Sequence, residues 1–85
     1  MSVKTFYYDL KVYVLMKLHL EQKGWIMFDD SHQDLFRSKP YNDQPEVWVR
    51  NYFDLGMNIG SDMSKAISDF ECAYKTAKRE LRGYQ

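Results

Sequence analysis

The stretch from Val3 to Lys23 constrains the fold most, because it carries more apolar side chains than one side of a regular element needs. On an α-helix one face would collect residues three or four positions apart, namely Val3, Phe6, Tyr7, Leu10, Val14 and Leu18. The other side would collect Tyr8, Val12, Leu15, Met16 and His19. We expect the first face to be buried on the core. The second face must then contact another element of this chain, a second copy or a partner.

The same stretch also fits a β-strand. Apolar residues occupy every second position from Leu10 to Leu20, and residues 22–24 would turn a hairpin into residues 25–28. The helix is favoured because the run is longer than most strands and is rich in Leu, Met and Lys. Gly24 stands where a glycine commonly follows the end of a helix.

Three later stretches predict short strands: Trp25–Phe28, Leu35–Ser38 and Glu46–Leu55. Turn-forming residues separate the first two, so that residues 29–34 are interpreted as a hairpin loop. Two prolines in the stretch from Lys39 to Pro45 indicate an exposed loop.

The Glu46–Leu55 strand would have two unlike faces. Alternation directs Val47 and Val49 toward the core and places Trp48, Arg50 and Tyr52 on the opposite face. Burial of Trp48, Arg50 and Tyr52 beneath a loop is the alternative.

The stretch from Asp62 to Arg82 predicts a helix with one apolar face. That face comprises Met63, Ala66, Ile67, Phe70, Ala73, Tyr74, Ala77 and Leu81. Ser61 or Asp62 is suited to cap its start, and Glu71 and Lys75 have the spacing of an ion pair. Gly83 suits its end.

These elements predict one small α+β domain over residues 1–85, in the order α-β-β-β-α. Short connections favour an antiparallel sheet of two or three strands. We expect both helices to pack on one face of this sheet.

The charge and the aromatic content bear on the class of partner. Twelve basic and twelve acidic residues cancel, and two Trp, seven Tyr and five Phe exceed what so small a core would hold. The sequence therefore favours a protein partner over nucleic acid, with aromatic residues in the interface. Candidate partner-binding residues are Trp48, Arg50 and Tyr52, the first-helix residues Tyr8, Val12 and Leu15, and the acidic residues Asp29, Asp30 and Asp34. The acidic residues would steer the approach to a basic surface.

Two further features of the sequence have the residue types of a chemical site. Asp29, Asp30, His32 and Asp34 lie close together, but their spacing matches no calcium or zinc motif, so an acidic turn is the preferred interpretation. Cys72 is expected to be an exposed thiol on the last helix. We expect no enzyme activity, no metal and no cofactor.

The cellular setting is expected to be the cytoplasm. The single cysteine excludes an internal disulfide. Charged residues in the first twenty positions exclude a signal peptide or membrane span there.

Two functional hypotheses remain. In the first the chain is a non-enzymatic protein-binding module, with a possible homodimer through the first helix. In size and in the use of its whole length it resembles the small proteins with which phages or mobile elements block a host enzyme or defence protein. The alternative is a small nucleic-acid-binding domain that uses the basic last helix, where Lys75, Lys78, Arg79 and Arg82 gather.

Overall fold

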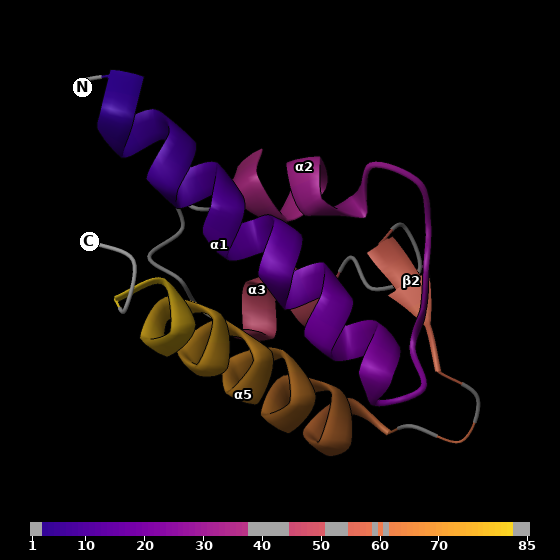
Figure 1. The fold of residues 1–85 in the computed structure, drawn as a ribbon. Coiled ribbons are helices and arrows are strands. Elements are labelled where there is room, and N and C mark those ends of the chain that lie inside the picture. The colour runs from indigo at the N-terminus through magenta and orange to yellow at the C-terminus, as the bar shows by residue number, and fades with distance from the viewer. Residues whose placement is uncertain (1–2, 38–44, 51–54, 59, 61, 83–85) are drawn as a thin grey trace.

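The computed structural model of this chain describes the backbone of residues 3–37, 45–50, 55–58, 60 and 62–82, and the side chains of these residues except 3–9 and 45–47. The elements follow in the order α1 (Val3–Gln22), β1 (Ile26–Met27), α2 (Ser31–Arg37), α3 (Pro45–Arg50), β2 (Gly56–Met57) and α5 (Met63–Arg82). Two long helices, two short helices and a two-stranded ribbon are thus described (Figure 1).

Helix α1 confirms the helical interpretation of the N-terminal stretch and ends as its sequence predicts. Gly24 has a φ of 98°, in the left-handed region that glycine adopts without strain. The N–H of Gly24 donates to the carbonyl of Glu21, and the N–H of Trp25 donates to the carbonyl of Leu20. This pair of hydrogen bonds is the Schellman arrangement, and Trp25 and Leu20 are both buried, as that motif favours.

The buried face of α1 is not the one expected from the sequence. Val12, Met16 and Leu20 are buried, whereas Val14 and Leu18, which were predicted to face the core, are 37% and 48% exposed. The reason lies in Tyr13, which is also buried and whose ring contacts Tyr74 and Trp48 from two other helices. Burial of this large aromatic ring fixes the rotation of the helix, so that Val12 and Met16 of the expected second face pack in the core.

Helix α5 confirms its prediction almost residue by residue. Its buried side chains are Ala66, Phe70, Ala73, Ala77 and Leu81. An Asp62 carboxylate oxygen accepts the backbone N–H of Lys65 at 2.7 Å, which is the expected cap. Lys75 and Glu71 form the predicted ion pair at 2.6 Å. Met63 departs from the pattern and is exposed.

Two stretches predicted as strands are helical where the structure describes them, over residues 35–37 and 46–50. Leu35 belongs to α2, where Leu35 and Ser31, four positions apart, are both buried. In the stretch from Glu46, Trp48 and Val49 are adjacent and both buried, which a strand with one core face would not allow. Pro45 starts α3, because its ring presets the first helical φ and its missing N–H leaves no hydrogen bond unmade there.

The described sheet has two strands, within the predicted two or three, but its strands are shorter than predicted and come from different segments. Strands β1 and β2 are antiparallel as expected, but they come from distant parts of the chain, and Ile26 is paired with Met57 and Met27 with Gly56. A Cβ on Gly56 would lie 2.5 Å from the carbonyl oxygen of Ile26, so only glycine permits this close approach. The ribbon is no platform for both long helices, because α1 packs directly on α5 and α2.

The core lies among α1, α2, α3 and α5 and is rich in aromatic rings. The Tyr13 ring lies 5.9 Å from Phe36 of α2, and the Trp48 ring of α3 lies 5.3 Å from Tyr74 of α5. Edge-to-face geometry in both pairs adds to the stabilisation from buried area. The ribbon lies on the side of the molecule opposite the start of α1 and the end of α5 (Figure 1).

Candidate protein-docking surface

The outer face of the β1–β2 ribbon carries three exposed apolar side chains. Ile26 and Met57 are directly opposite each other across the strands and are 60% and 38% exposed. Phe28 is 39% exposed, and its N–H donates to the carbonyl of Leu55, which continues the register of the ribbon. Since side chains alternate along a strand, Ile26 and Phe28 point outward while Met27 points to the core. We call Ile26, Phe28 and Met57 the ribbon patch.

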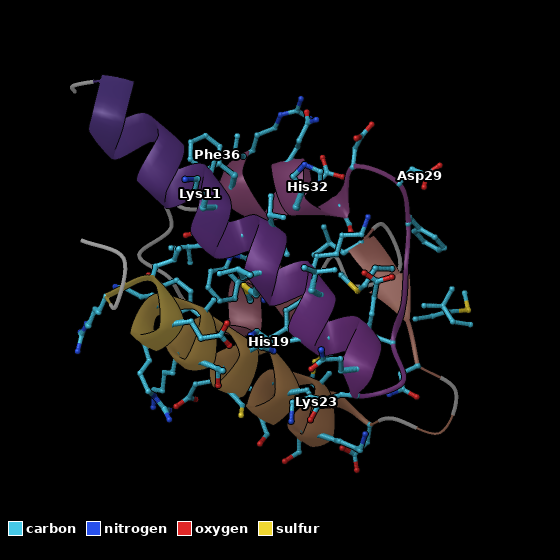
Figure 2. All side chains as sticks on the ribbon, viewed as in Figure 1. Lys11, His19, Lys23, Asp29, His32 and Phe36 are labelled. Carbon is cyan, nitrogen blue, oxygen red and sulfur yellow. The ribbon has the colours of Figure 1, made fainter. Side chains whose placement is uncertain are left out.

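Acidic side chains follow the ribbon patch directly. Asp29 and Asp30 are exposed, and Figure 2 shows Asp29 at the edge of the molecule that carries the ribbon. Asp30 has a φ of 61°, a left-handed conformation that Asp tolerates better than most residues, and this sharp turn starts α2. Asp34 lies within α2 and pairs with Arg37 at 3.2 Å. The exposed carboxylates of Asp29 and Asp30 therefore border the ribbon patch on one side, and Oδ1 of Asp30 accepts a hydrogen bond from the Gln33 amide at 3.4 Å.

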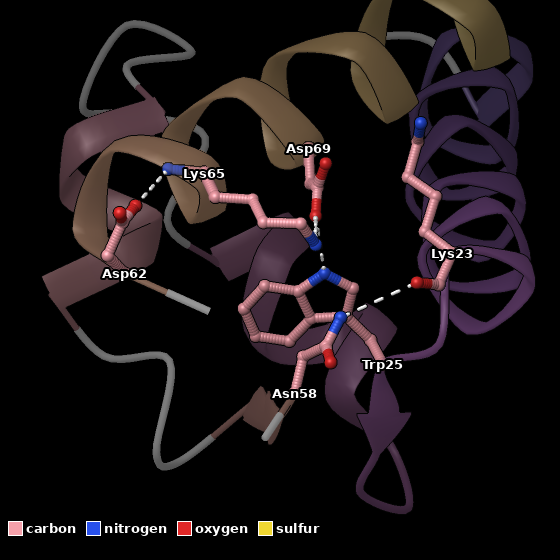
Figure 3. Close-up of polar contacts among 6 residues, drawn as sticks. All are labelled: Lys23, Trp25, Asn58, Asp62, Lys65 and Asp69. Carbon is pink, nitrogen blue, oxygen red and sulfur yellow. Dashed lines mark hydrogen bonds and ion pairs between the residues drawn. The ribbon is translucent and has the colours of Figure 1, made fainter. Parts of the chain in front are cut away.

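The ribbon is tied to the long helices through Trp25 (Figure 3). The Trp25 ring is buried against Phe70 at 5.2 Å, and its Nε1–H donates to Oδ2 of Asp69 at 3.0 Å. Lys65 Nζ lies 3.3 Å from the same oxygen. On the second strand's side, the Asn58 amide donates to the carbonyl of Lys23 at 3.4 Å. These contacts hold β1 and β2 at a defined place on the surface.

Several residues predicted to contact a partner are instead part of the core. Trp48 is 1% exposed and Val12 is 3% exposed, so the expectation that they line a contacted surface is wrong. Leu15 is half-buried against the core. Arg50 is exposed at the end of α3, and because it lies two positions after Trp48 in a helix, the two side chains are on different faces. The Tyr8 side chain and Tyr52 lie outside the described residues, as do Gly83 and residues 39–44 of the predicted loop.

The prediction for the acidic residues is closer to what the structure shows. Asp29, Asp30 and Asp34 are all exposed and lie within one turn and the start of α2. Their apolar neighbours were not singled out from the sequence. The alternation of Ile26 and Phe28 around Met27 was available as a signal, but the partner strand that brings in Met57 comes from a stretch interpreted only as a break in the pattern.

The outer face of α5 holds a shallow open groove of about 390 Å³. It is lined by Ser64, Ile67, Ser68, Glu71, Cys72, Lys75, Thr76 and Arg79. Cys72 is a free, exposed thiol, as predicted. The carboxylate of Glu71 pairs with Lys75 within this groove, and this ion pair reduces the positive charge of the groove. Lys78 does not line the groove but lies over the Tyr74 ring, 5.0 Å from its centroid.

His19 is used in the packing of the long helices. Figure 2 shows it between α1 and α5, and its Nε2 lies 2.6 Å from Oε1 of Glu80. Within the described part of the chain, no group of three His, Cys, Asp or Glu side chains is arranged to hold a metal ion. None of the described helices is long and apolar enough to cross a membrane.

Comparison of the chain with protein-family models, with curated proteins and with solved structures finds no match.

Proposed function

We propose that this chain is a small protein-binding module without catalytic activity, and that the ribbon patch is its docking surface. The observation that carries the proposal is the outward cross-strand pair of Ile26 and Met57 beside Phe28, bordered by the exposed carboxylates of Asp29 and Asp30. An apolar centre with a charged rim is the usual anatomy of a protein interface.

The chemistry of the patch defines the partner. Three adjacent apolar side chains would fill a hydrophobic depression, and their removal from water would supply most of the binding free energy. Asp29 and Asp30 would face basic residues at the rim of that depression and accelerate the encounter. The partner is therefore a protein with an apolar pocket flanked by Lys or Arg.

The mode of action we propose is occlusion. The module would cover a functional surface of its target, in the manner of an inhibitor from a phage or a mobile element acting on a host enzyme or defence protein. Its size suits this role, because an interface of ordinary dimensions, about 800 Å² on each partner, is a sizeable part of so small a surface.

A capture experiment with three forms of the protein tests the proposal. Immobilised wild type is compared with a double variant, Ile26→Ser with Phe28→Ser, and with the control Met63→Ser. Met63 is 51% exposed on α5, so the control removes an exposed apolar side chain away from the ribbon. We expect one protein to be retained from a bacterial lysate by wild type and by Met63→Ser, and to be lost with the double variant.

The folds of all three forms are checked by circular dichroism, and the captures are repeated with nuclease and at two salt concentrations. Equal retention of the same protein by all three forms would refute the ribbon patch as the docking surface. Recovery of nucleic acid alone, lost at high salt, would support instead the basic α5 interpretation. That alternative has exposed Arg79 and Arg82 in its favour.

A further inference from the structure

The outer face of α1 is a second apolar surface, separate from the ribbon patch. Val14 and Leu18 lie at its centre and are 37% and 48% exposed. In Figure 1 helix α1 is the element nearest the viewer, with α2 behind it. The core does not need these two side chains, because Val12, Met16 and Leu20 fill it from the opposite side of the helix.

Opposite charges flank this apolar pair at equal spacing. Lys11 precedes Val14 by three residues, and Glu21 follows Leu18 by three, and both charged side chains are exposed. Neither has an ion pair or side-chain hydrogen bond with another residue that the structure describes. The spacing of three, four and three residues keeps all four on one stripe of the helix, the spacing of a helix–helix seam.

This stripe is complementary to itself when it is turned end for end. If two copies of α1 lie antiparallel about a two-fold axis at the level of residue 16, Val14 of one copy faces Leu18 of the other. In the same register each Lys11 faces a Glu21, at the two ends of a seam about 15 Å long. A two-fold contact of this kind uses the same surface on both copies and is closed, so it produces dimers and not filaments.

We infer that the chain forms a weak homodimer through the antiparallel pairing of α1 with α1 of a second copy. The contact is smaller than that of an obligate dimer, since only two apolar side chains from each copy lie at its centre. The first-helix homodimer expected from the sequence used Val12 and Leu15. The inferred one uses the opposite face, because those two residues pack in the core.

Charge reversal tests whether Lys11 of one copy pairs with Glu21 of the other, as this register requires. Sedimentation velocity from about 10 µM to about 1 mM covers the range expected for a small interface. We expect Lys11→Glu and Glu21→Lys each to raise the dimer dissociation constant by about tenfold, because two attractive pairs become two repulsive ones. The double variant carrying both reversals should regain the dimer, because it restores opposite charges in the antiparallel register.

Two further variants complete the design. Leu18→Ser should yield a monomer, and Met63→Ser should dimerise like wild type. A wild type that is monomeric at the highest concentration would overturn the inference. So would a dimer that the charge reversals leave unchanged, or single reversals that the double variant fails to rescue. The inference is independent of the ribbon patch, so Ile26→Ser should leave the dimer intact.

Discussion

The orientation of α1 can be tested with two substitutions of the same residue type, Val12→Ala and Val14→Ala. Val12 is 3% exposed and Val14 is 37% exposed, although they are two positions apart. Removing two carbon groups from a buried valine loses about 1.6 kcal/mol of transfer free energy, and the cavity raises the loss to about 2–3 kcal/mol. At Val14 less transfer free energy is lost, because the side chain is partly exposed, and alanine's better helix propensity offsets this loss by up to about 0.7 kcal/mol.

We therefore expect Val12→Ala to lower the free energy of unfolding by about 2–3 kcal/mol and Val14→Ala to change it by less than about 0.5 kcal/mol. For a domain of this size the loss expected for Val12→Ala corresponds to a fall in Tm of about 10 °C or more. Urea unfolding followed by tryptophan fluorescence measures both, since Trp25 and Trp48 are buried. Low micromolar protein keeps association of α1 out of the measurement.

The result that would refute this orientation is an equal loss for the two variants, or a larger loss for Val14→Ala. A second pair on the same two faces, Met16→Ala and Leu18→Ala, repeats the test with larger side chains. Met16 is buried, so Met16→Ala should lower the free energy of unfolding by about 2–5 kcal/mol. Leu18 is half-exposed, so Leu18→Ala should lower it much less.

Three further substitutions test the packing around the ribbon and the core. Gly56→Ala places a Cβ about 0.9 Å closer to the Ile26 carbonyl oxygen than the 3.4 Å of ordinary contact. We expect this substitution to lower the free energy of unfolding by about 1–3 kcal/mol, as measured by urea titration. Trp48→Ala should cost about 3–5 kcal/mol in the same assay, and an unchanged stability would show that this ring is not core. Asp69→Ala should lower the free energy of unfolding by about 1–3 kcal/mol. Asp69→Asn should lower it less, because the amide oxygen can still accept the Trp25 N–H. Equal losses of stability for the two variants in thermal unfolding would argue against that hydrogen bond.

The long helices were predictable from the sequence because their patterns extend over many turns. The stripe from Ala66 to Leu81 repeats at helical spacing throughout, and Gly24 marks the end of α1. The rotation of α1 was not predictable, because both of its sides are apolar. The contacts of Tyr13 with rings on α3 and α5 decide it, and they are known only once the helices are packed.

The short helices were missed because alternation over a few residues does not distinguish a strand from a helical turn. From Val47 to Arg50 the sequence alternates between small apolar and other side chains, which favoured a strand. Pro45 was the signal for a helix start and was assigned to a loop. In α2, Asp30 and Ser31 before Leu35 were interpreted as a turn alone, although such residues also begin helices.

The candidate site shows the same division between local and long-range information. The exposure of Asp29 and Asp30 follows from the local turn-forming sequence, and it was predicted. The union of Ile26 with Met57 depends on strand pairing across some thirty residues, which no local pattern reports. Tryptophan is common in interfaces, which favours Trp48 as a contact residue, but in a small domain a large ring is as readily the centre of the core.

Hydrogen–deuterium exchange tests the central claim, docking through the ribbon patch, most directly. Exchange is measured on the chain alone and on its complex with the protein that wild type captures and the Ile26→Ser with Phe28→Ser variant does not. The proposal predicts slower exchange in the complex at residues 26–30 and 56–58, with α5 unchanged. Slower exchange confined to residues 63–82 would contradict it and would place the partner on the outer face of α5.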